Sequence, residues 1–283
     1  MRDLREYHRP SSAAEAVRLK REYGAKAVYL GGSTDLLVHR PAGVEAAIDI
    51  RHAGIDYVRV DDSEVVIGGG ALLRDAEKAV AGVAGGMLRQ AVRETAPWLI
   101  RNAATLAGNI ANASPAADSV PALMVLGARL VLWGEAEEEV SIEDILSGPH
   151  RTLLGDRLIR EIRVPRTDGV RAAFHKLARS ASDIALVNVA VALKLEGGVA
   201  RDVVIALGAV APTAIRARQA EAALEGMPPT EELLVEVEKV VADEVRPISD
   251  WRASEGYRRR MSGVFVRRLL SQALNGEQSR AAA

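Results

Sequence analysis

A stretch dominated by small side chains constrains this chain more than any other feature of its sequence. Residues 101–119 read RNAATLAGNIANASPAADS, and neither lysine nor glutamate occurs from residue 100 to residue 132. Small residues let a backbone pack closely against another backbone or against a flat ligand. A structural crossing of two chain segments and a ligand-binding loop anchored by Asn109, Asn112 and Asp118 are therefore both compatible with the pattern. We expect few helical residues from Trp98 to Pro121.

Two glycine-rich turns could also approach a ligand. Gly31-Gly32-Ser33-Thr34-Asp35 follows a short apolar strand, so its consecutive backbone N–H groups and its two hydroxyl groups could form a nest for a phosphate. An ordinary turn is an equally good interpretation of this segment alone, and Asp35 is expected to point away or to cap the following backbone. Residues 68–70 join a strand to a helix but lack the third glycine and the acidic residue of a dinucleotide-binding fingerprint, so they are interpreted as a tight turn.

Short strands and helices follow one another without strict alternation, which favours an α+β fold over a doubly wound parallel sheet. In the first helix, Ser11 and Ser12 can cap the start, an apolar stripe follows, and Tyr23-Gly24 ends the helix. The predicted strands cover residues 25–30, 47–50, 57–60, 65–67, 157–164, 172–178, 184–195 and 200–207. Further helices are predicted at residues 72–80, 86–96, 230–244 and 256–274, and a linker at residues 165–169.

The composition excludes several classes of function. The chain has no cysteine, which excludes disulfide bonds, cysteine-ligated iron–sulfur clusters and a thiolate nucleophile within it. With 37 basic and 38 acidic residues and a net charge of -1, it offers no basic face for nucleic acid. The apolar runs are too short for a membrane span, and the first residues do not resemble a signal peptide. We therefore expect a cytoplasmic protein.

Residues that could carry acid–base or metal chemistry are scattered along the chain. The five histidines show no metal-ligand spacing, so structural or surface roles are expected, and we assign no catalytic and no metal-binding residue. Arg258, Arg259 and Arg260 lie in a predicted helix. A solvated helix face is the favoured interpretation of these arginines, and a partner-binding or cofactor-adjacent cluster is the alternative.

Four blocks of the sequence together resemble one known family. LGGSTDLL, from Leu30 to Leu37, precedes the small-residue segment in the order and spacing of that family. Phe174-His175-Lys176 with the residues that follow through Val187, and ISDWRASEGYRRRM from Ile248 to Met261, are similar to its later blocks. The chain thus resembles, over nearly its whole length, the FAD-binding medium subunit of the molybdenum hydroxylases, the group that includes xanthine dehydrogenase and carbon monoxide dehydrogenase.

The fold implied by the resemblance has two domains. The first is a PCMH-type, vanillyl-alcohol-oxidase-like FAD-binding domain over residues 1–166, with α+β subdomains of about residues 1–55 and 56–166. The second is a smaller α+β domain of the carbon monoxide dehydrogenase flavoprotein type over residues 170–275. The flavin is expected between the two domains.

The resemblance also implies cofactor-binding residues, position by position. The backbone of a first loop would hold the FAD pyrophosphate, and a second loop corresponds to the family's Thr-Ile-Gly-Gly-Asn. Asp118 matches an acidic residue that contacts FAD, and Ile159 matches an apolar residue that lies against the flavin ring or the adenine. Lys176 matches a lysine near the flavin, where a cation could stabilise negative charge. The first loop is Tyr29, Leu30, Gly31, Gly32, Ser33, Thr34, Asp35 and Leu36, and the second is Thr105, Leu106, Ala107, Gly108 and Asn109.

Ala107 departs from the family pattern, because alanine stands where the family usually has the first glycine of this motif. The backbone at this position must therefore avoid positive φ or carry a strain of about 1 kcal/mol. Lys176 is one of only six lysines against 31 arginines, which favours a specific role over that of a surface lysine. Gly32→Val is expected to abolish FAD binding by filling the approach to the phosphates.

The function implied by the resemblance is electron transfer. In the family, a large subunit oxidises substrate at a molybdenum centre, electrons cross [2Fe-2S] clusters in a small subunit, and FAD in the medium subunit passes them to an external acceptor. Both subunits are expected as partners, in a dimer of heterotrimers. A stand-alone flavin oxidoreductase of the same fold and a scaffold that has lost FAD are the alternatives. The former calls for a catalytic base or a covalent flavin attachment, for which the sequence offers no convincing residue.

Overall fold

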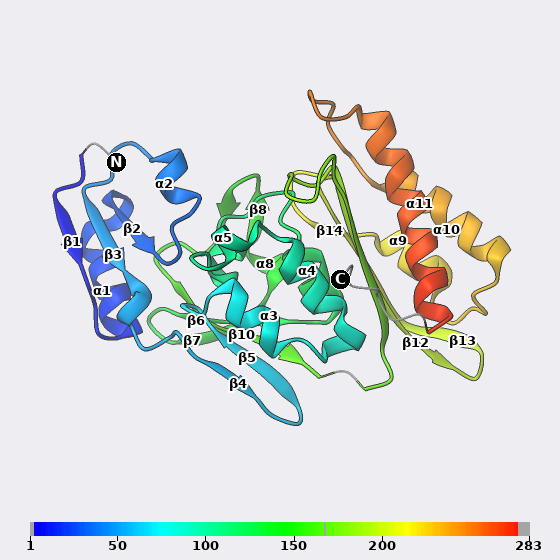
Figure 1. Ribbon diagram of the computed structural model, residues 1–283, viewed down its shortest axis with the longest axis horizontal. Helices are drawn as coiled ribbons and strands as arrows, with labels where there is room; N and C mark the ends of the chain where they lie inside the picture. Colours follow the sequence, from blue (N-terminus) through cyan, green and yellow to red (C-terminus); the bar gives the residue numbers. More distant parts are fainter. Residues whose placement is uncertain (1–2, 167, 277–283) are drawn as a thin grey trace.

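Three larger β-sheets follow one another along the long axis of the molecule, each with its own helices (Figure 1). The computed structural model describes residues 3–166 and 168–276. The sheet of the N-terminal part is parallel, has the order β1-β3-β2 and packs against α1. Its elements are β1 (Glu6–His8), α1 (Ala13–Tyr23), β2 (Ala27–Leu30), α2 (Leu36–His39) and β3 (Ala46–Asp49), with 3₁₀ turns at Gly24–Lys26 and Ile50–His52.

The first helix begins and ends where the sequence predicts. Ser12 caps its start, because the side-chain oxygen accepts a hydrogen bond from Glu15 N at 3.2 Å. Gly24 ends it with a φ of 55°, a conformation that glycine adopts without strain. The buried face consists of Ala16, Val17 and Leu19. The helix therefore covers the sheet from which the first glycine loop leaves.

An antiparallel five-stranded sheet of order β4-β5-β10-β6-β7 forms the centre of the molecule, and short helices pack on one of its faces. Its strands are β4 (Val58–Val60), β5 (Glu64–Gly68), β6 (Arg129–Trp133), β7 (Glu137–Ser141) and β10 (Leu158–Pro165). The helices are α3 (Leu73–Ala79), α4 (Met87–Glu94), α5 (Trp98–Arg101), α6 (Leu106–Ala111), α7 (Ser119–Val125) and α8 (Ile142–Ile145), with a 3₁₀ turn at Val83–Gly86. A small hairpin joins β8 (Leu146–Gly148) to β9 (Arg151–Thr152).

The segment from Trp98 to Pro121 is more helical than predicted, because α5, α6 and the start of α7 lie within it. Alanine, the commonest residue of this segment, has the highest helix propensity of all residues, although α5 contains none. Packing stabilises turns that would be too short to persist alone, and every residue of α7 is buried. The expectation of a helix-poor segment was therefore wrong.

The glycine run at residues 68–70 is a structural turn between β5 and α3, as predicted. A Cβ atom at Gly68 would lie 2.3 Å from Ile55 O, and one at Gly69 would lie 2.0 Å from Ile159 O. Both distances are far below van der Waals contact. Glycine is therefore required here by the close approach of neighbouring backbone.

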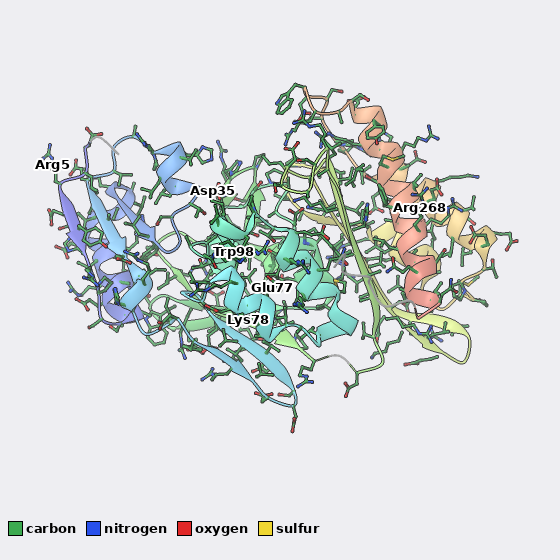
Figure 2. All side chains as sticks on the ribbon, viewed as in Figure 1. Arg5, Asp35, Glu77, Lys78, Trp98 and Arg268 are labelled. Atoms are coloured by element: carbon green, nitrogen blue, oxygen red, sulfur yellow. The ribbon has the colours of Figure 1, made fainter. Side chains whose placement is uncertain are left out.

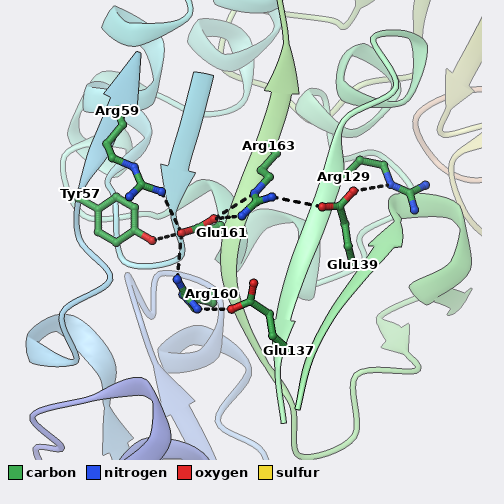
Figure 3. Close-up of polar contacts among 8 residues, drawn as sticks. All are labelled: Tyr57, Arg59, Arg129, Glu137, Glu139, Arg160, Glu161 and Arg163. Carbon is green, nitrogen blue, oxygen red and sulfur yellow. Dashed lines mark hydrogen bonds and ion pairs between the residues drawn. The ribbon is translucent and has the colours of Figure 1, made fainter. Parts of the chain in front are cut away.

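The other face of the central sheet carries a network of arginine and glutamate side chains (Figure 3). The Glu161 carboxylate is buried and accepts hydrogen bonds from Tyr57 and, at 3.1 Å, from Arg163. Arg163 in turn lies 3.4 Å from Glu139. Arg59, Arg129, Glu137 and Arg160 complete the network. Opposite charges compensate the buried carboxylate, so the network explains how the charge of Glu161 can be buried.

The C-terminal part is an antiparallel sheet of order β11-β12-β13-β14 between two helical layers (Figure 1). Its elements are β11 (Arg171–Leu177), β12 (Val187–Glu196), β13 (Val199–Gly208), β14 (Ile215–Arg216), α9 (Arg218–Leu224), α10 (Glu231–Glu244) and α11 (Glu255–Leu274). Along β12, Val189 and Val191 belong to the core beneath α10 and α11, whereas Ala190 and Ala192 belong to the central core. The C-terminal sheet therefore shares one apolar core with the central part.

Arg258 is buried, which contradicts the expectation that the three consecutive arginines form a solvated helix face. Its guanidinium donates to Leu186 O at 2.6 Å and pairs with Asp250 at 2.9 Å. Of the other two arginines, Arg259 is partly buried and Arg260 is exposed. The physical reason is that the first turns of α11 face the loops at the end of the sheet, where these two acceptors compensate the buried charge.

Separate sheets with helices on their faces confirm the predicted α+β class. Within the residues that the structure describes, no helix is long and apolar enough to cross a membrane.

Candidate functional site

The two loops that the sequence singles out lie in direct contact, although they are far apart along the chain. The first leaves β2, and the second runs from α5 into α6. A Cβ atom at Gly32 would lie 2.3 Å from Ala103 O and 2.5 Å from Ala104 Cα. Asp35 and Trp98, labelled near the middle of the molecule in Figure 2, mark the two loops. The fold therefore builds one surface from both segments.

The first loop leaves a row of hydrogen-bond donors without a partner. Among the described residues, the backbone N–H groups of Gly32, Ser33 and Thr34 make no hydrogen bond to a protein acceptor. Ser33 Oγ is buried and has no partner in this part of the chain either. Ser33 has a φ of 57°, a left-handed conformation that occurs in anion-binding backbone nests. The loop is therefore suited to an anion such as a pyrophosphate.

Thr105 and Gly108 define the start of α6 in the second loop. Thr105 Oγ1 accepts a hydrogen bond from Gly108 N at 3.0 Å, and a Cβ atom at Gly108 would lie 2.7 Å from the same oxygen. Leu106 points into the central core. Ala107 lies within the helix and has no positive φ, so its alanine side chain causes no backbone strain. A Cβ atom at Gly31 would lie 3.4 Å from Thr105 Oγ1, which is an ordinary van der Waals distance.

Polar side chains tie the two loops to each other and to α7. Asp35 Oδ2 accepts a hydrogen bond from Asn112 Nδ2 at 3.2 Å. Its side chain does not cap the start of α2, which was one of the two expected roles. Asn109 Oδ1 accepts a hydrogen bond from Ser119 Oγ at 2.7 Å. The asparagines that the sequence suggests as anchors therefore anchor the loops themselves.

Asp118 and Lys176 form a buried ion pair between the central and the C-terminal parts. Lys176 Nζ lies 2.7 Å from Asp118 Oδ2 and donates a second hydrogen bond to Glu94 O at 2.9 Å. The lysine side chain is only 6% exposed, which excludes a surface role. Burial raises the pKa of Asp118 to about 6, while the positive charge of Lys176 opposes this shift. The carboxylate is therefore ionised at neutral pH and protonated in mild acid.

Asn188 completes this cluster and was missed by the sequence analysis. Its Nδ2 donates a hydrogen bond to Asp118 Oδ1 at 2.8 Å. Asn188 is a lone amide within the apolar strand sequence VNVAVAL. Because buried polar side chains almost always have partners, this pattern could have indicated a buried polar contact.

The remaining predicted residues take part in the framework of the site. Tyr29 donates its hydroxyl hydrogen to Asp156 O at 2.7 Å, and Leu30 ends β2. Leu36 begins α2. Ile159 is 4% exposed and packs in the central core. Contact of Ile159 with a cofactor stays a prediction.

The chemistry of the site fits a phosphate-containing cofactor such as FAD. Backbone donors and a buried hydroxyl that lack a partner among the described residues lie on segments that contact one another and the segment of the buried lysine–carboxylate pair. Over residues 3–166 and 168–276, no group of three or more histidine, aspartate or glutamate side chains is placed to hold a metal ion. The donors and the ion pair are suited to binding such a cofactor and to compensating its charge.

Comparison with known families defines the class of protein. Residues 2–167 match the FAD binding domain in molybdopterin dehydrogenase, and residues 172–273 match the CO dehydrogenase flavoprotein C-terminal domain. The chain is thus a flavoprotein, and its cofactor is FAD. It belongs to the family of FAD-binding medium subunits of the molybdenum hydroxylases, as the sequence blocks implied.

Individual relatives agree with this assignment. The carbon monoxide dehydrogenase medium chain of Hydrogenophaga pseudoflava is 32% identical over 276 residues, which cover 95% of this chain and 96% of the relative. The glyceraldehyde dehydrogenase medium chain of Sulfolobus acidocaldarius is 32% identical over 182 residues, which cover 64% of this chain and 65% of that protein. A solved carbon monoxide dehydrogenase from H. pseudoflava, which lacks the Mo-pyranopterin moiety of its molybdenum cofactor, superposes with a TM-score of 0.91 at 33% identity, over 96% of this chain and 98% of the other. The predicted fold is confirmed, and the chain is an oxidoreductase subunit.

Proposed function

We propose that this chain receives electrons from [2Fe-2S] clusters of a partner subunit and passes them through FAD to an external acceptor. Bound FAD supplies a redox centre that exchanges electrons singly or in pairs. The contact between the two loops supports the proposal, because the first loop brings together N–H donors and a buried Ser33 Oγ that have no partner among the described residues. The chain's own tasks are to bind the cofactor, to orient it and to compensate its charge.

The proposed binding residues divide by chemistry. Backbone groups of residues 29–36 and 105–109 would hold the pyrophosphate, with Ser33 Oγ as an additional donor. Lys176 would place a positive charge near the flavin, and its pairing with Asp118 would keep the net charge of this pair at zero. Ile159 would supply an apolar contact. No residue of the chain is assigned an acid–base step, because substrate oxidation would occur in a partner.

The proposed partners are a large molybdenum-cofactor subunit and a small [2Fe-2S] subunit, assembled as a dimer of heterotrimers. The chain has no cysteine, so the cluster ligands must come from another chain. The relatives are themselves named medium chains, a name that supports a multi-subunit assembly.

Exposed apolar side chains beside the two loops support a docking surface for a partner. Trp98 and Leu99 of α5 are 66% and 73% exposed, and Leu37 and Val38 of α2 are 52% and 75% exposed. Apolar side chains grouped on a surface commonly mark protein interfaces, where tryptophan is enriched. We therefore propose that α2 and α5 contact the [2Fe-2S] subunit.

Copurification of all subunits tests this arrangement. The double variant Trp98→Ser/Leu99→Ser is expected to lose association with the [2Fe-2S] subunit while retaining FAD. Val60→Ser is a matched control, because Val60 is 53% exposed on β4, away from the loops. Full association of the double variant, or equal loss in the control, would refute the assignment of this surface.

The alternative of a stand-alone flavin enzyme makes a different prediction. An enzyme of that kind would oxidise NADH or an alcohol without partners, whereas we expect the purified FAD-loaded chain to show no such turnover. Steady-state assays of the chain alone and of the reassembled complex distinguish the two functions.

A further inference from the structure

A row of three residues crosses the inner face of the C-terminal sheet. Lys176 of β11 is directly opposite Asn188 of β12, which is directly opposite Gly208 of β13. This face also carries Ala190 and Ala206 of the central core, and α7 packs against it. The row therefore faces the segment that leads into α7.

The first two residues of the row hold one carboxylate between them. Asn188 Nδ2 donates to Asp118 Oδ1 at 2.8 Å, and Lys176 Nζ donates to Asp118 Oδ2 at 2.7 Å. Each carboxylate oxygen thus has its own donor, and the donors come from opposed positions on neighbouring strands. Asn188 is fully buried and Asp118 is 3% exposed, so these donors replace the hydration that the charge would have in water.

The third residue of the row makes room for this arrangement. A Cβ atom at Gly208 would lie 2.3 Å from Asn188 Oδ1 and 3.0 Å from Pro115 O. The next residue, Ala209, donates its backbone N–H to Pro115 O at 2.6 Å, and Asn188 Nδ2 also reaches Ala116 O at 3.3 Å. Because Gly208 has no side chain, the sheet, the Asn188 amide group and the segment before α7 can pack closely together.

We propose that Asn188 is a positioning residue of the flavin site, which holds the Asp118 carboxylate ionised and in place opposite Lys176. The inference rests on the proposed function, because it takes Asp118 and Lys176 to face FAD. Without the amide donor the carboxylate is less well stabilised and binds a proton more readily. Lys176 is then uncompensated, and an added positive charge near the flavin favours the reduced cofactor.

The midpoint potential of the FAD-loaded protein tests the proposal in Asn188→Leu. Leucine has the same branched arrangement of side-chain heavy atoms as asparagine but has no hydrogen-bond donor. Val189→Ala is the matched control, because Val189 is the next residue of β12, is 1% exposed and faces the other core. We expect a more positive potential in Asn188→Leu and the wild-type potential in Val189→Ala. The wild-type potential in Asn188→Leu, or an equal shift in the control, would overturn the proposal.

A second pair of variants separates charge from packing. In Asp118→Asn there is no carboxylate to hold, so adding Asn188→Leu should leave the potential unchanged. A further shift in this double variant would contradict the role of Asn188. In Gly208→Ala the added methyl group would collide with Asn188 Oδ1, so the potential should shift in the same direction as in Asn188→Leu. This variant replaces Asn188→Leu in the test if the leucine variant does not fold.

The outcomes also separate this inference from the proposed function. Wild-type protein that binds no FAD would contradict the proposed function. FAD-loaded Asn188→Leu and Gly208→Ala proteins with the wild-type potential would contradict the positioning role alone.

Discussion

Gly32 lies against the carbonyl oxygen of Ala103, so closely that a Cβ atom on this glycine would stand 2.3 Å from that oxygen. The contact joins the loop after β2 to the loop before α6. It also changes the reason why the glycine is needed. Any side chain at this position would first push the two loops apart, before it reached the approach to a phosphate.

Gly32→Val is expected to abolish FAD binding and to lower the free energy of unfolding by about 2 kcal/mol through overpacking. Gly82→Val is the control, because a Cβ atom at Gly82 would have no neighbour within 4 Å. FAD titration and urea denaturation of both variants measure the two effects. Stoichiometric FAD in Gly32→Val would show that the loop contact is not needed for the cofactor.

Ser33→Ala separates binding from stability. Ser33 Oγ is buried without a partner among the described residues, so removing it costs the folded protein no hydrogen bond. The melting temperature of the FAD-free protein should therefore stay the same or rise, whereas FAD affinity should fall about tenfold, for one lost hydrogen bond of roughly 1.4 kcal/mol. Ser63→Ala, in the turn between β4 and β5, should leave the affinity unchanged. Unaltered FAD affinity in Ser33→Ala would remove this hydroxyl from the site.

Asp118 should make the stability of the FAD-free protein depend on pH. Its pKa is raised from 3.8 to about 6, so its contribution to stability is present at low pH and is lost as the pH rises through 6. Burial is the main cause, Lys176 opposes the shift, and the charge of Glu94 adds to it. The free energy of unfolding of the wild type, relative to Asp118→Asn, should fall by about 2 kcal/mol between roughly pH 4 and pH 7. A difference that stays constant in denaturation at both pH values would contradict the shift.

The predicted linker between the two domains should be the first site of proteolysis. β10 ends at Pro165 and β11 begins at Arg171. Because Phe174 and Ala190 pack in the central core, the two fragments should stay associated after cleavage between residues 166 and 170. Limited proteolysis followed by size-exclusion chromatography measures both effects. Fragments that elute separately would contradict the shared core.

Local sequence signals predicted the elements that depend on nearby residues. Ser12 and Gly24 mark the ends of α1 because both caps act within a few residues of the helix. The glycine turn at residues 68–70 and the long strands of the C-terminal sheet also followed from short-range pattern. The two loops were identified as a pair only by resemblance, since nothing in either segment indicates that it contacts the other.

The errors concern residues whose environment depends on distant parts of the chain. Arg258 is buried because Asp250 and Leu186 supply acceptors, and a run of arginines gives no sign of those acceptors. The short helices α5 and α6 were missed because packing stabilises them more than their own sequence does. Asn188 was missed because its partner Asp118 is close only in the folded chain.

Electron transfer from the partner tests the central claim most directly. The FAD-loaded chain is mixed without oxygen with the reduced [2Fe-2S] subunit, and the visible absorption of the flavin is followed in time. We expect the flavin absorption to bleach as the clusters are reoxidised, and the chain alone, without the reduced subunit, to show no change. Flavin that stays oxidised in the presence of the reduced [2Fe-2S] subunit would contradict the account.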